Sequence, residues 1–225
     1  MTDTSNLLKN TVNIADKDVE NRLLDAAEEL FCQKGFAGTS IRDITAKADC
    51  NVAAVNYHFG SKEKLYLQIF KQHFSRLRDN HIAAINKVMS GPAGSITLHN
   101  LLRSYATAFV EPLVGKNKTS RLVTLMSREM LDPHLSPTLF YDDMMLPVQK
   151  VMQDAIRKVC PAISDEDSAL SIISIVGQLI HIVRFTEFIE RDRAIKVPFD
   201  LNRMVEHAVN FSAAGIQAVV KTKPV

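Results

Sequence analysis

The segment from Thr39 to Lys64 constrains the fold of this chain more than any other, because two short helical patterns lie in it with only a few residues between them. The first pattern repeats apolar and small residues at helical spacing: Ile41, Ile44, Thr45 and Ala48. Ser40 stands just before it and Asp43 follows three residues later, which is the arrangement of a capping box. We therefore expect a helix to begin next to Ser40.

A turn at residues 49–51 (DCN) ends the first helix, and a second short helix is expected over residues 52–59. Asp and Asn are the non-glycine residues that best tolerate a left-handed turn, and Asn51 is also suited to cap the second helix. In that helix Val55 and Phe59 lie four residues apart, so they share the face that turns inward.

The opposite face of the second helix carries an amide, a phenol and an imidazole: Asn56, Tyr57 and His58. Asn can bond adenine with two hydrogen bonds and Tyr can bond a phosphate oxygen, so this face is suited to DNA. The helix starts at Thr39–Ser40 and Ser61–Lys62 leave backbone N–H groups that attract phosphates. Helix pairs with a tight turn also occur in proteins that never touch nucleic acid, so the turn alone leaves both interpretations open.

The composition indicates an all-α protein, because glycine and proline are few and no run of alternating β-branched residues occurs. A net charge of +2 excludes a generally basic surface, so contact with DNA must depend on locally placed Lys and Arg. Cys32, Cys50 and Cys160 form no CxxC pair and indicate free thiols in a reducing cytoplasm. Cys50 is either a redox-sensitive thiol or a filler of a small apolar gap.

About nine helices are expected in four parts of the chain. Residues 1–16 are polar and indicate a flexible N-terminal arm, and residues 17–64 form a three-helix DNA-binding domain whose first helix ends at Gly35 in a left-handed cap. Residues 65–92 belong to one long linking helix, which stops at the sequence SGP. Residues 93–225 make a helical domain for ligand binding and dimerisation.

The helix expected over residues 165–191 is apolar on nearly all sides, so nearly all sides must be covered. Gln178, His181 and Arg184 interrupt its apolar run, which argues against a membrane span. A second copy of the chain is then the predicted cover, paired through this helix and the last one. The residues assigned to the dimer interface are Ile172, Val176, Ile180, Val183, Met204, Ala208, Phe211 and Gly215.

Catalytic and metal-binding patterns are missing from the sequence: it has no GxSxG, no phosphate-binding loop and no HExxH. We therefore expect no enzyme, no cofactor and no metal. Methionines and isolated polar residues in apolar helices are either ordinary core residues and internal pairs, or the lining of an effector cavity. The tentative effector residues are Met126, Arg128, Met130, Met145, Gln178, His181 and Arg184.

The first part of the chain closely resembles the N-terminal domain of the tetracycline-repressor (TetR) family. The resemblance rests on the runs AAEELF, KGF, GTSIRDI, AKA and YHFGSKEKL, at residues 26–31, 34–36, 38–44, 46–48 and 57–65. The chain departs from the family at Asp49, where members usually carry Gly, and at Cys50, where they carry an apolar residue. A looser likeness, to the subgroup with a CecR-like C-terminal domain, rests on NVAA at 51–54, SRE at 127–129, and IVGQ at 175–178 with Phe185.

The resemblance implies a homodimer whose two reading helices enter successive major grooves of a palindromic operator, and which a small-molecule effector releases. The expected DNA-binding residues are Thr39, Ser40, Arg42, Asn51, Val52, Ala53, Ala54, Asn56, Tyr57, His58 and Lys62. The prediction is a cytoplasmic, ligand-responsive transcriptional repressor. The alternative is a helical dimer that binds a small molecule or a protein and does not read DNA.

Overall fold

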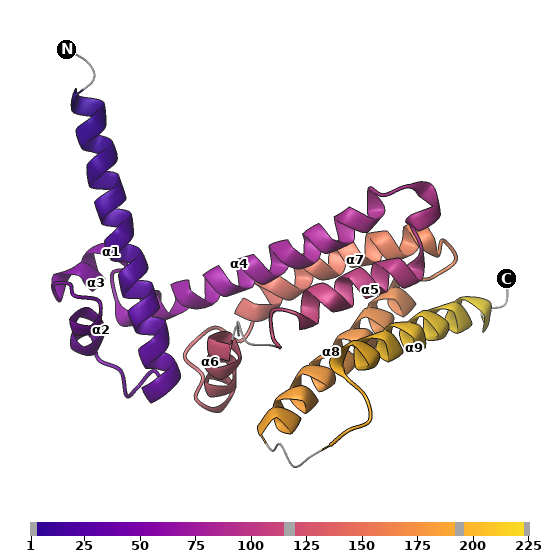
Figure 1. Cartoon of the computed structure of the whole chain (residues 1–225). Coiled ribbons are helices and arrows are strands. Elements are labelled where there is room, and N and C mark those ends of the chain that lie inside the picture. The colour runs from indigo at the N-terminus through magenta and orange to yellow at the C-terminus, as the bar shows by residue number, and fades with distance from the viewer. Residues whose placement is uncertain (1–3, 115–119, 192–195, 223–225) are drawn as a thin grey trace. The chain divides into compact units, whose positions relative to one another are not determined.

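The computed structural model describes residues 4–114, 120–191 and 196–222, and every regular element in these ranges is helical. The helices follow one another along the chain as shown in Figure 1, and no β-strand occurs in the described ranges. This confirms the all-α prediction. The chain divides into two compact units, and each is described separately.

The first unit comprises residues 1–73 and 120–137. It contains α1 (Thr4–Lys34), α2 (Ile41–Lys47), α3 (Ala53–His58), the beginning of α4 (Lys62–Met89) and α6 (Ser120–Leu131). Its core is made of fully buried side chains: Leu23, Phe31, Ile44, Val55 and Leu65. Each such burial stabilises the unit by about 1.5–3 kcal/mol. The core therefore holds the two short helices α2 and α3 on the longer α1 and α4.

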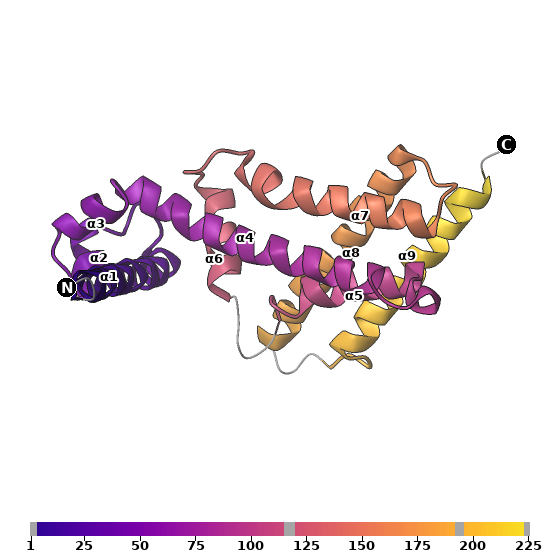
Figure 2. The ribbon, with the colours of Figure 1, turned by 90° about the horizontal axis from the view of Figure 1, so that it is seen from above.

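The second unit comprises residues 74–119 and 138–225. It contains the rest of α4, a 3-10 turn at Ala93–Ser95, α5 (Leu98–Val110), α7 (Leu146–Val159), α8 (Asp165–Arg191) and α9 (Leu201–Thr222). Helices α8 and α9 lie side by side in both views, and α5 packs against α7, α8 and α9 (Figures 1 and 2). One continuous apolar cluster joins these helices, with Leu101, Met152, Ile175, Leu179 and Val209 at its centre.

The start of α1 differs from the sequence prediction. The flexible arm was expected over residues 1–16, whereas α1 is helical from Thr4 onward. The physical reason is that residues 4–34 contain neither proline nor glycine, so nothing in the backbone stops the helix from extending toward the N-terminus.

Helix α6 also lies in a different place from the one expected. The predicted division assigns residues 93–225 to one C-terminal domain, but α6 packs against α1 and belongs to the first unit. Two arginines account for this: Arg121 and Arg128 both bond to α1. The first unit is therefore built from two separate stretches of sequence.

The helix expected from Ser136–Pro137 to Val159 begins with a short π-helix at Tyr141–Met145 before α7 continues it. A π-helical turn inserts one extra residue into the helical repeat, and such turns are rare. Here the backbone carbonyl of Asp143 accepts a hydrogen bond from Arg78 of α4 at 3.1 Å. The irregular turn thus brings a carbonyl group to the side of α4.

Helix α8 is long and apolar enough to cross a membrane by length and composition. Within the second unit, however, one face of it fills the common core through Ile172, Ile175, Leu179, Ile182 and Val183. A core helix of a globular protein has the same composition, so this feature does not require a membrane.

Candidate functional site

Helix α2 starts at the capping box that the sequence predicts. The Oγ atom of Ser40 accepts from the backbone N–H of Asp43, and the Asp43 carboxylate accepts from the backbone N–H of Ser40, both at 3.1 Å. These hydrogen bonds from Ser40, with Lys34 nearby, lower the pKa of Asp43. The first turn of α2 is therefore fixed, and its own carboxylate uses the Ser40 N–H group that was expected to bind a phosphate.

Thr39 does not present its side chain to a DNA backbone, which corrects the prediction for this residue. The side chain is buried, and its Oγ1 atom donates to the carbonyl groups of Gly35 at 2.8 Å and Leu30 at 3.2 Å. Gly35 itself has φ of +77° and ends α1 as predicted. Thr39 thus fastens the connection between α1 and α2.

The turn between α2 and α3 has the predicted left-handed residue, because Asp49 has φ of +50°. Arg22 of α1 donates to the carbonyl oxygens of Ala48 at 2.8 Å and Asp49 at 3.3 Å. On the other side, Oδ1 of Asn51 accepts from the backbone N–H of Ala53 at 3.0 Å and so caps α3. The sulfur of Cys50 bonds back to the carbonyl of Ala48 at 3.2 Å.

Helix α3 has an inward apolar face and an outward polar face, as the sequence indicates. Val55 is fully buried and Phe59 is half-buried, whereas Asn56 is exposed and Tyr57 is 76% exposed. Around these, Val52 and Ala53 are exposed, and Ala54 and His58 are half-buried. The rings of Tyr57 and His58 meet edge to face at 4.9 Å. The outward face thus carries small residues at the front and hydrogen-bonding groups behind them.

The prediction that Lys62 contacts a phosphate also has to be corrected. Its ammonium group donates to the carbonyl oxygens of Phe36 and Thr39, both at 3.0 Å, and lies 4.1 Å from the centre of the Phe36 ring. Two of its three N–H donors are therefore used inside the first unit. Lys62 joins the start of α4 to the α1–α2 connection, and its role is structural.

Two cations near α3 remain available for phosphates. Arg42 on α2 and Lys64 on α4 are exposed, and within the described ranges no carboxylate pairs with either side chain. Neighbouring cations are occupied, since Lys47 pairs with Glu29 at 2.8 Å and Arg22 with Asp18 at 3.2 Å. Among the described residues, the positive charge available around α3 is therefore limited to these two side chains.

The predicted effector residues are divided between the two units. Met126, Arg128 and Met130 lie on α6 in the first unit, and Met145 lies in the π-helix of the second unit. Arg128 bonds to the carbonyl groups of Cys32 and Gln33, at 3.1 and 3.0 Å, and so caps the end of α1. For Arg128 this is the internal pairing that the sequence left open as the alternative to an effector contact.

A cleft of about 1070 Å³ lies between α8 and α9. Gln178 and His181, two of the predicted effector residues, line it, while Arg184 lies outside it and faces Glu187 at 4.0 Å. The cleft also contains residues that the sequence did not assign to an effector site, above all Phe185, Arg203 and His207. No group of three His, Cys, Asp or Glu side chains able to hold a metal occurs among the residues that the structure describes.

Comparison with known proteins agrees with this arrangement. Residues 23–69 match the family "Bacterial regulatory proteins, tetR family". Residues 98–216, more than half of the chain, match "HTH-type transcriptional dual regulator CecR, C-terminal domain". The chain belongs to the TetR family of transcriptional regulators. Its C-terminal part is of the CecR type, as the looser likeness implied.

Among individual proteins, the TetR-family chain is 27% identical to the dual regulator CecR of Shigella flexneri over 140 residues, which are 61% of this chain and 62% of CecR. It is 26% identical to the repressor DhaR of Mycobacterium sp. (strain GP1) over 103 residues, 46% of this chain and 49% of DhaR. The matches thus span less than two thirds of these relatives. A solved transcriptional regulator from Pseudomonas aeruginosa shares the fold, with a TM-score of 0.68 and 17% identity over 88% of this chain and 90% of that one.

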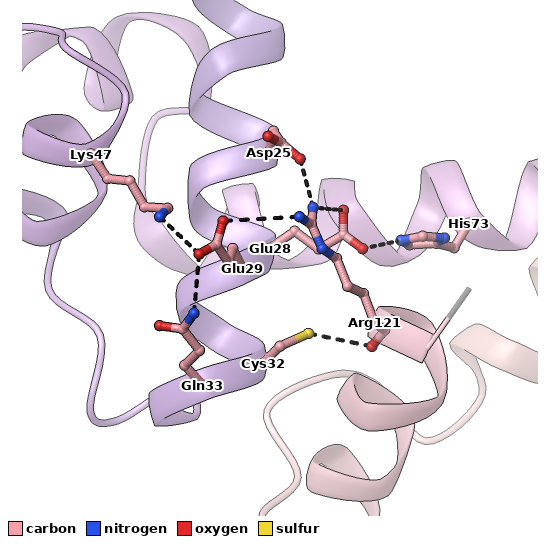
Figure 3. A network of polar contacts seen from close by, with 8 residues as sticks. All are labelled: Asp25, Glu28, Glu29, Cys32, Gln33, Lys47, His73 and Arg121. Atoms are coloured by element: carbon pink, nitrogen blue, oxygen red, sulfur yellow. Dashed lines mark hydrogen bonds and ion pairs between the residues drawn. The ribbon is translucent and has the colours of Figure 1, made fainter. Parts of the chain in front are cut away.

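Sequence reasoning missed the polar network that joins α1 to α2, α4 and α6 in this TetR-family protein. Three carboxylates on one face of α1 form its centre: Asp25, Glu28 and Glu29 (Figure 3). Arg121 of α6 lies 2.6, 3.7 and 3.9 Å from them in that order. His73 of α4 pairs with Glu28 at 2.9 Å. In the sequence, the only local sign of this network is that Glu28 and Glu29 follow Asp25 by three and four residues.

The same network surrounds Cys32, whose sulfur bonds to the carbonyl of Arg121 at 3.4 Å. Burial, followed by the charge of Glu28, raises the pKa of the Cys32 thiol to about 11. A thiolate is the reactive form of cysteine, so this thiol is held in its unreactive form at neutral pH.

The predicted dimer residues fall into two groups in this TetR-family fold. Ile172, Val183 and Ala208 are buried in the core of their own unit, which corrects their assignment. Ile180, Phe211 and Gly215 are exposed, and Val176 and Met204 are half-buried. The sequence pattern could not separate the groups, because α8 is apolar on both its inner and its outer face.

Proposed function

We propose that this regulator binds a palindromic DNA operator and represses transcription. The observation that carries the proposal is the exposed face of α3, on which Val52, Ala53, Asn56 and Tyr57 stand over a turn fixed by Arg22. An exposed amide and phenol on a rigidly held helix are suited to base edges and phosphates. The relative DhaR is named as a repressor, which supports the sign of the effect.

We infer that the protein acts as a homodimer. An apolar stripe runs along the exposed side of α8 and continues onto α9: Leu170, Ile173, Ile180, Phe188 and Phe211. Exposed side chains of this size favour burial against a partner. A two-fold dimer would place its two reading helices on half-sites about 34–36 Å apart or at a multiple of that.

The regulator is proposed to respond to a small molecule bound in the second unit. A ligand shifts DNA binding only to the extent that it prefers one state of the dimer over the other. A typical coupling of about 1–3 kcal/mol would change operator affinity roughly five- to 150-fold. We expect the protein to work in the cytoplasm, without a membrane, cofactor, metal or catalytic activity of its own.

A gel-shift and footprint on the DNA upstream of the coding region, at two salt concentrations and with random competitor DNA, tests the proposal. A protected palindrome with steep salt dependence is expected, since each neutralised phosphate releases counterions. Protection of no specific sequence, here or in a genome-wide selection for bound DNA, would favour the helical dimer that does not read DNA. Light scattering at micromolar concentration tests the homodimer, and a monomeric mass would contradict it.

A further inference from the structure

The π-helical turn before α7 has a chemical cause in the sequence. Pro147 lies inside the continuous helical stretch that the turn at Tyr141–Met145 and α7 form together. A proline inside a helix has no N–H group for the carbonyl four residues earlier, and its ring clashes with that carbonyl. The residue four positions before Pro147 is Asp143. The proline therefore opens the helix here and leaves the Asp143 carbonyl without its ordinary helical partner.

Arg78 of α4 replaces the missing N–H group. Its Nη1 atom donates to the carbonyl oxygen of Asp143 at 3.1 Å, in a partly buried position. A carbonyl group that is removed from water without a donor costs free energy, so an acceptor of this kind favours a donor from a neighbouring element. Pro147 thus creates the acceptor, and α4 supplies the donor.

The guanidinium group of Arg78 is oriented by its own helix. Its Nη2 atom donates to the Oγ atom of Ser75 at 2.9 Å, and its Nε atom donates to the carboxylate of Asp79 at 3.0 Å. The Oγ atom of Ser75 in turn donates to Asp79 at 3.3 Å. Each nitrogen of the guanidinium group therefore has a partner, and the planar group is directed at Asp143.

This contact joins a helix that is shared by both units to a helix of the second core. Helix α4 is continuous from Lys62 to Met89, so it begins in the first unit and ends in the second. Helix α7 packs against α5 and α8. The rings of Phe74 on α4 and Phe140 before the π-turn meet edge to face at 5.1 Å and form a second contact of the same two segments. Rigid helices carry coupling between distant sites, so the place of α4 beside α7 bears on DNA binding.

We propose that the hydrogen bond between Arg78 and Asp143, called here the latch, positions α4 for operator binding, and that Pro147 makes the latch possible. A regular helix at this point would give the Asp143 carbonyl a backbone partner and leave Arg78 without its acceptor. Arg78 is thus a positioning residue that acts through α4. The inference rests on the proposed function and names the contact through which α7 influences the DNA-binding unit.

A purely local role is the alternative, in which Arg78 only satisfies the carbonyl group and α4 does not depend on it. Two variants that break the latch from opposite sides distinguish the roles. Arg78→Met removes the donor and leaves the carbonyl of Asp143 unpaired. Pro147→Ala restores the helical N–H group, so it breaks the latch without leaving a carbonyl unpaired. Only the first variant should lose stability.

Urea unfolding of the wild type, the two variants and the double variant tests the origin of the latch. Arg78→Met should raise the unfolding equilibrium constant about fivefold in the wild type, the usual effect of one lost hydrogen bond. In the Pro147→Ala background it should raise this constant less than about twofold, because Asp143 then has its helical partner. Equal effects in both backgrounds, or a Pro147→Ala protein less stable than the wild type, would overturn this origin.

Gel shifts on the operator test the positioning role. Arg78→Met and Pro147→Ala should each lower operator affinity at least about fivefold, and the double variant should lose no more than either, because all three lack the same contact. The salt slope should stay unchanged, since no phosphate contact is lost. Arg76→Met is the matched control, because it removes an exposed arginine of the same helix, and it should bind like the wild type.

The result for Pro147→Ala decides between the two roles. Its loss of operator affinity could not come from unfolding, because this variant is expected to be at least as stable as the wild type. Wild-type operator affinity in Pro147→Ala would overturn the positioning role and leave Arg78 a local one. If no operator is found at all, the proposed function fails together with the positioning role, whereas the unfolding measurements still decide whether Arg78 and Pro147 are coupled.

Discussion

Arg22 of α1 donates to the carbonyl oxygen of Ala48 at 2.8 Å, so the end of α2 is held by a side chain from another helix. The last carbonyl groups of a helix have no partner within it, and a cation there satisfies them. Because the next residue, Asp49, takes the left-handed conformation without being glycine, this contact stabilises the turn at its most demanding point.

Replacing Arg22 with methionine, which keeps the apolar stem and removes the guanidinium, should therefore loosen the turn. We expect a loss of about 1 kcal/mol in the free energy of unfolding, the usual net value of such a hydrogen bond. Operator affinity should fall by a similar factor, about fivefold. Urea unfolding and gel-shift titration measure the two effects. Asp18→Asn is the control, because it removes only the ion pair of Arg22, and an equal loss in it would contradict this account.

Substitutions of Lys62 and Arg42 should have different effects, although both residues are cations near α3. Lys62→Met removes two internal hydrogen bonds and should lower the free energy of unfolding by about 1–3 kcal/mol. Arg42→Met should leave stability unchanged and reduce the salt slope of DNA binding by about 1, as expected for one lost phosphate contact. Thermal unfolding and gel shifts at several salt concentrations separate them. A Lys62→Met protein with unchanged stability and a reduced salt slope would show that Lys62 contacts a phosphate after all.

Asn56 is expected to read a base, because its amide is exposed on the outward face of α3. Asn56→Ala should cost about 1–3 kcal/mol on the operator and relax the preference at one position of each half-site. Tyr57→Phe should weaken specific and random DNA alike, since a phosphate contact carries no sequence information. A selection from random DNA with each variant gives the answer. Equal losses on both kinds of DNA for Asn56→Ala would refute its role.

His81 of α4 should make the second unit sensitive to acid. The ring is 1% exposed, lies between Tyr105 and Phe109, and has no partner with hydrogen-bond geometry among the described residues. Burial lowers its pKa from 6.5 to about 4, and the nearby carbonyl of Leu77 opposes this only in part.

The folded state therefore binds this proton less readily than the unfolded state does. The stability linked to the neutral ring is fully present above pH 6.5 and is lost as the pH falls toward 4, by an amount on the order of 3 kcal/mol. Thermal unfolding between pH 7.5 and pH 4.5 should show this slope in the wild type and a flatter one in His81→Leu. His99→Gln changes a half-buried histidine whose ring bonds to Asn210 at 3.1 Å, and it should keep the wild-type slope. An unchanged slope in His81→Leu would contradict the assignment.

The sequence predicted the parts of this fold that depend on near neighbours. The capping box joins Ser40 to Asp43, the inward turn of Val55 follows from its spacing to Phe59, and the left-handed Asp49 follows from its place between two short helices. Each of these is decided within a few residues.

The parts that sequence reasoning missed depend on partners far along the chain. Lys62 bonds to Thr39 across 23 residues and Arg128 to Cys32 across 96, and a lysine or arginine gives no local sign of whether it meets a phosphate or a carbonyl group. The same limit applies to α8, where Ile172 and Ile180 look alike in the sequence, and only the packing of α5, α7 and α9 decides which of them is buried.

The position of α6 in the first unit has a consequence for exchanging parts among related regulators. The residues that hold α1 from the side, Arg121 and Arg128, are encoded some ninety residues downstream of the helices that they support. A hybrid that takes residues 1–73 from this chain and the remainder from a relative would replace the helix whose Arg121 pairs with Asp25, Glu28 and Glu29. The DNA-binding unit of this regulator therefore consists of residues 1–73 together with residues 120–137, and a working hybrid has to transfer both stretches.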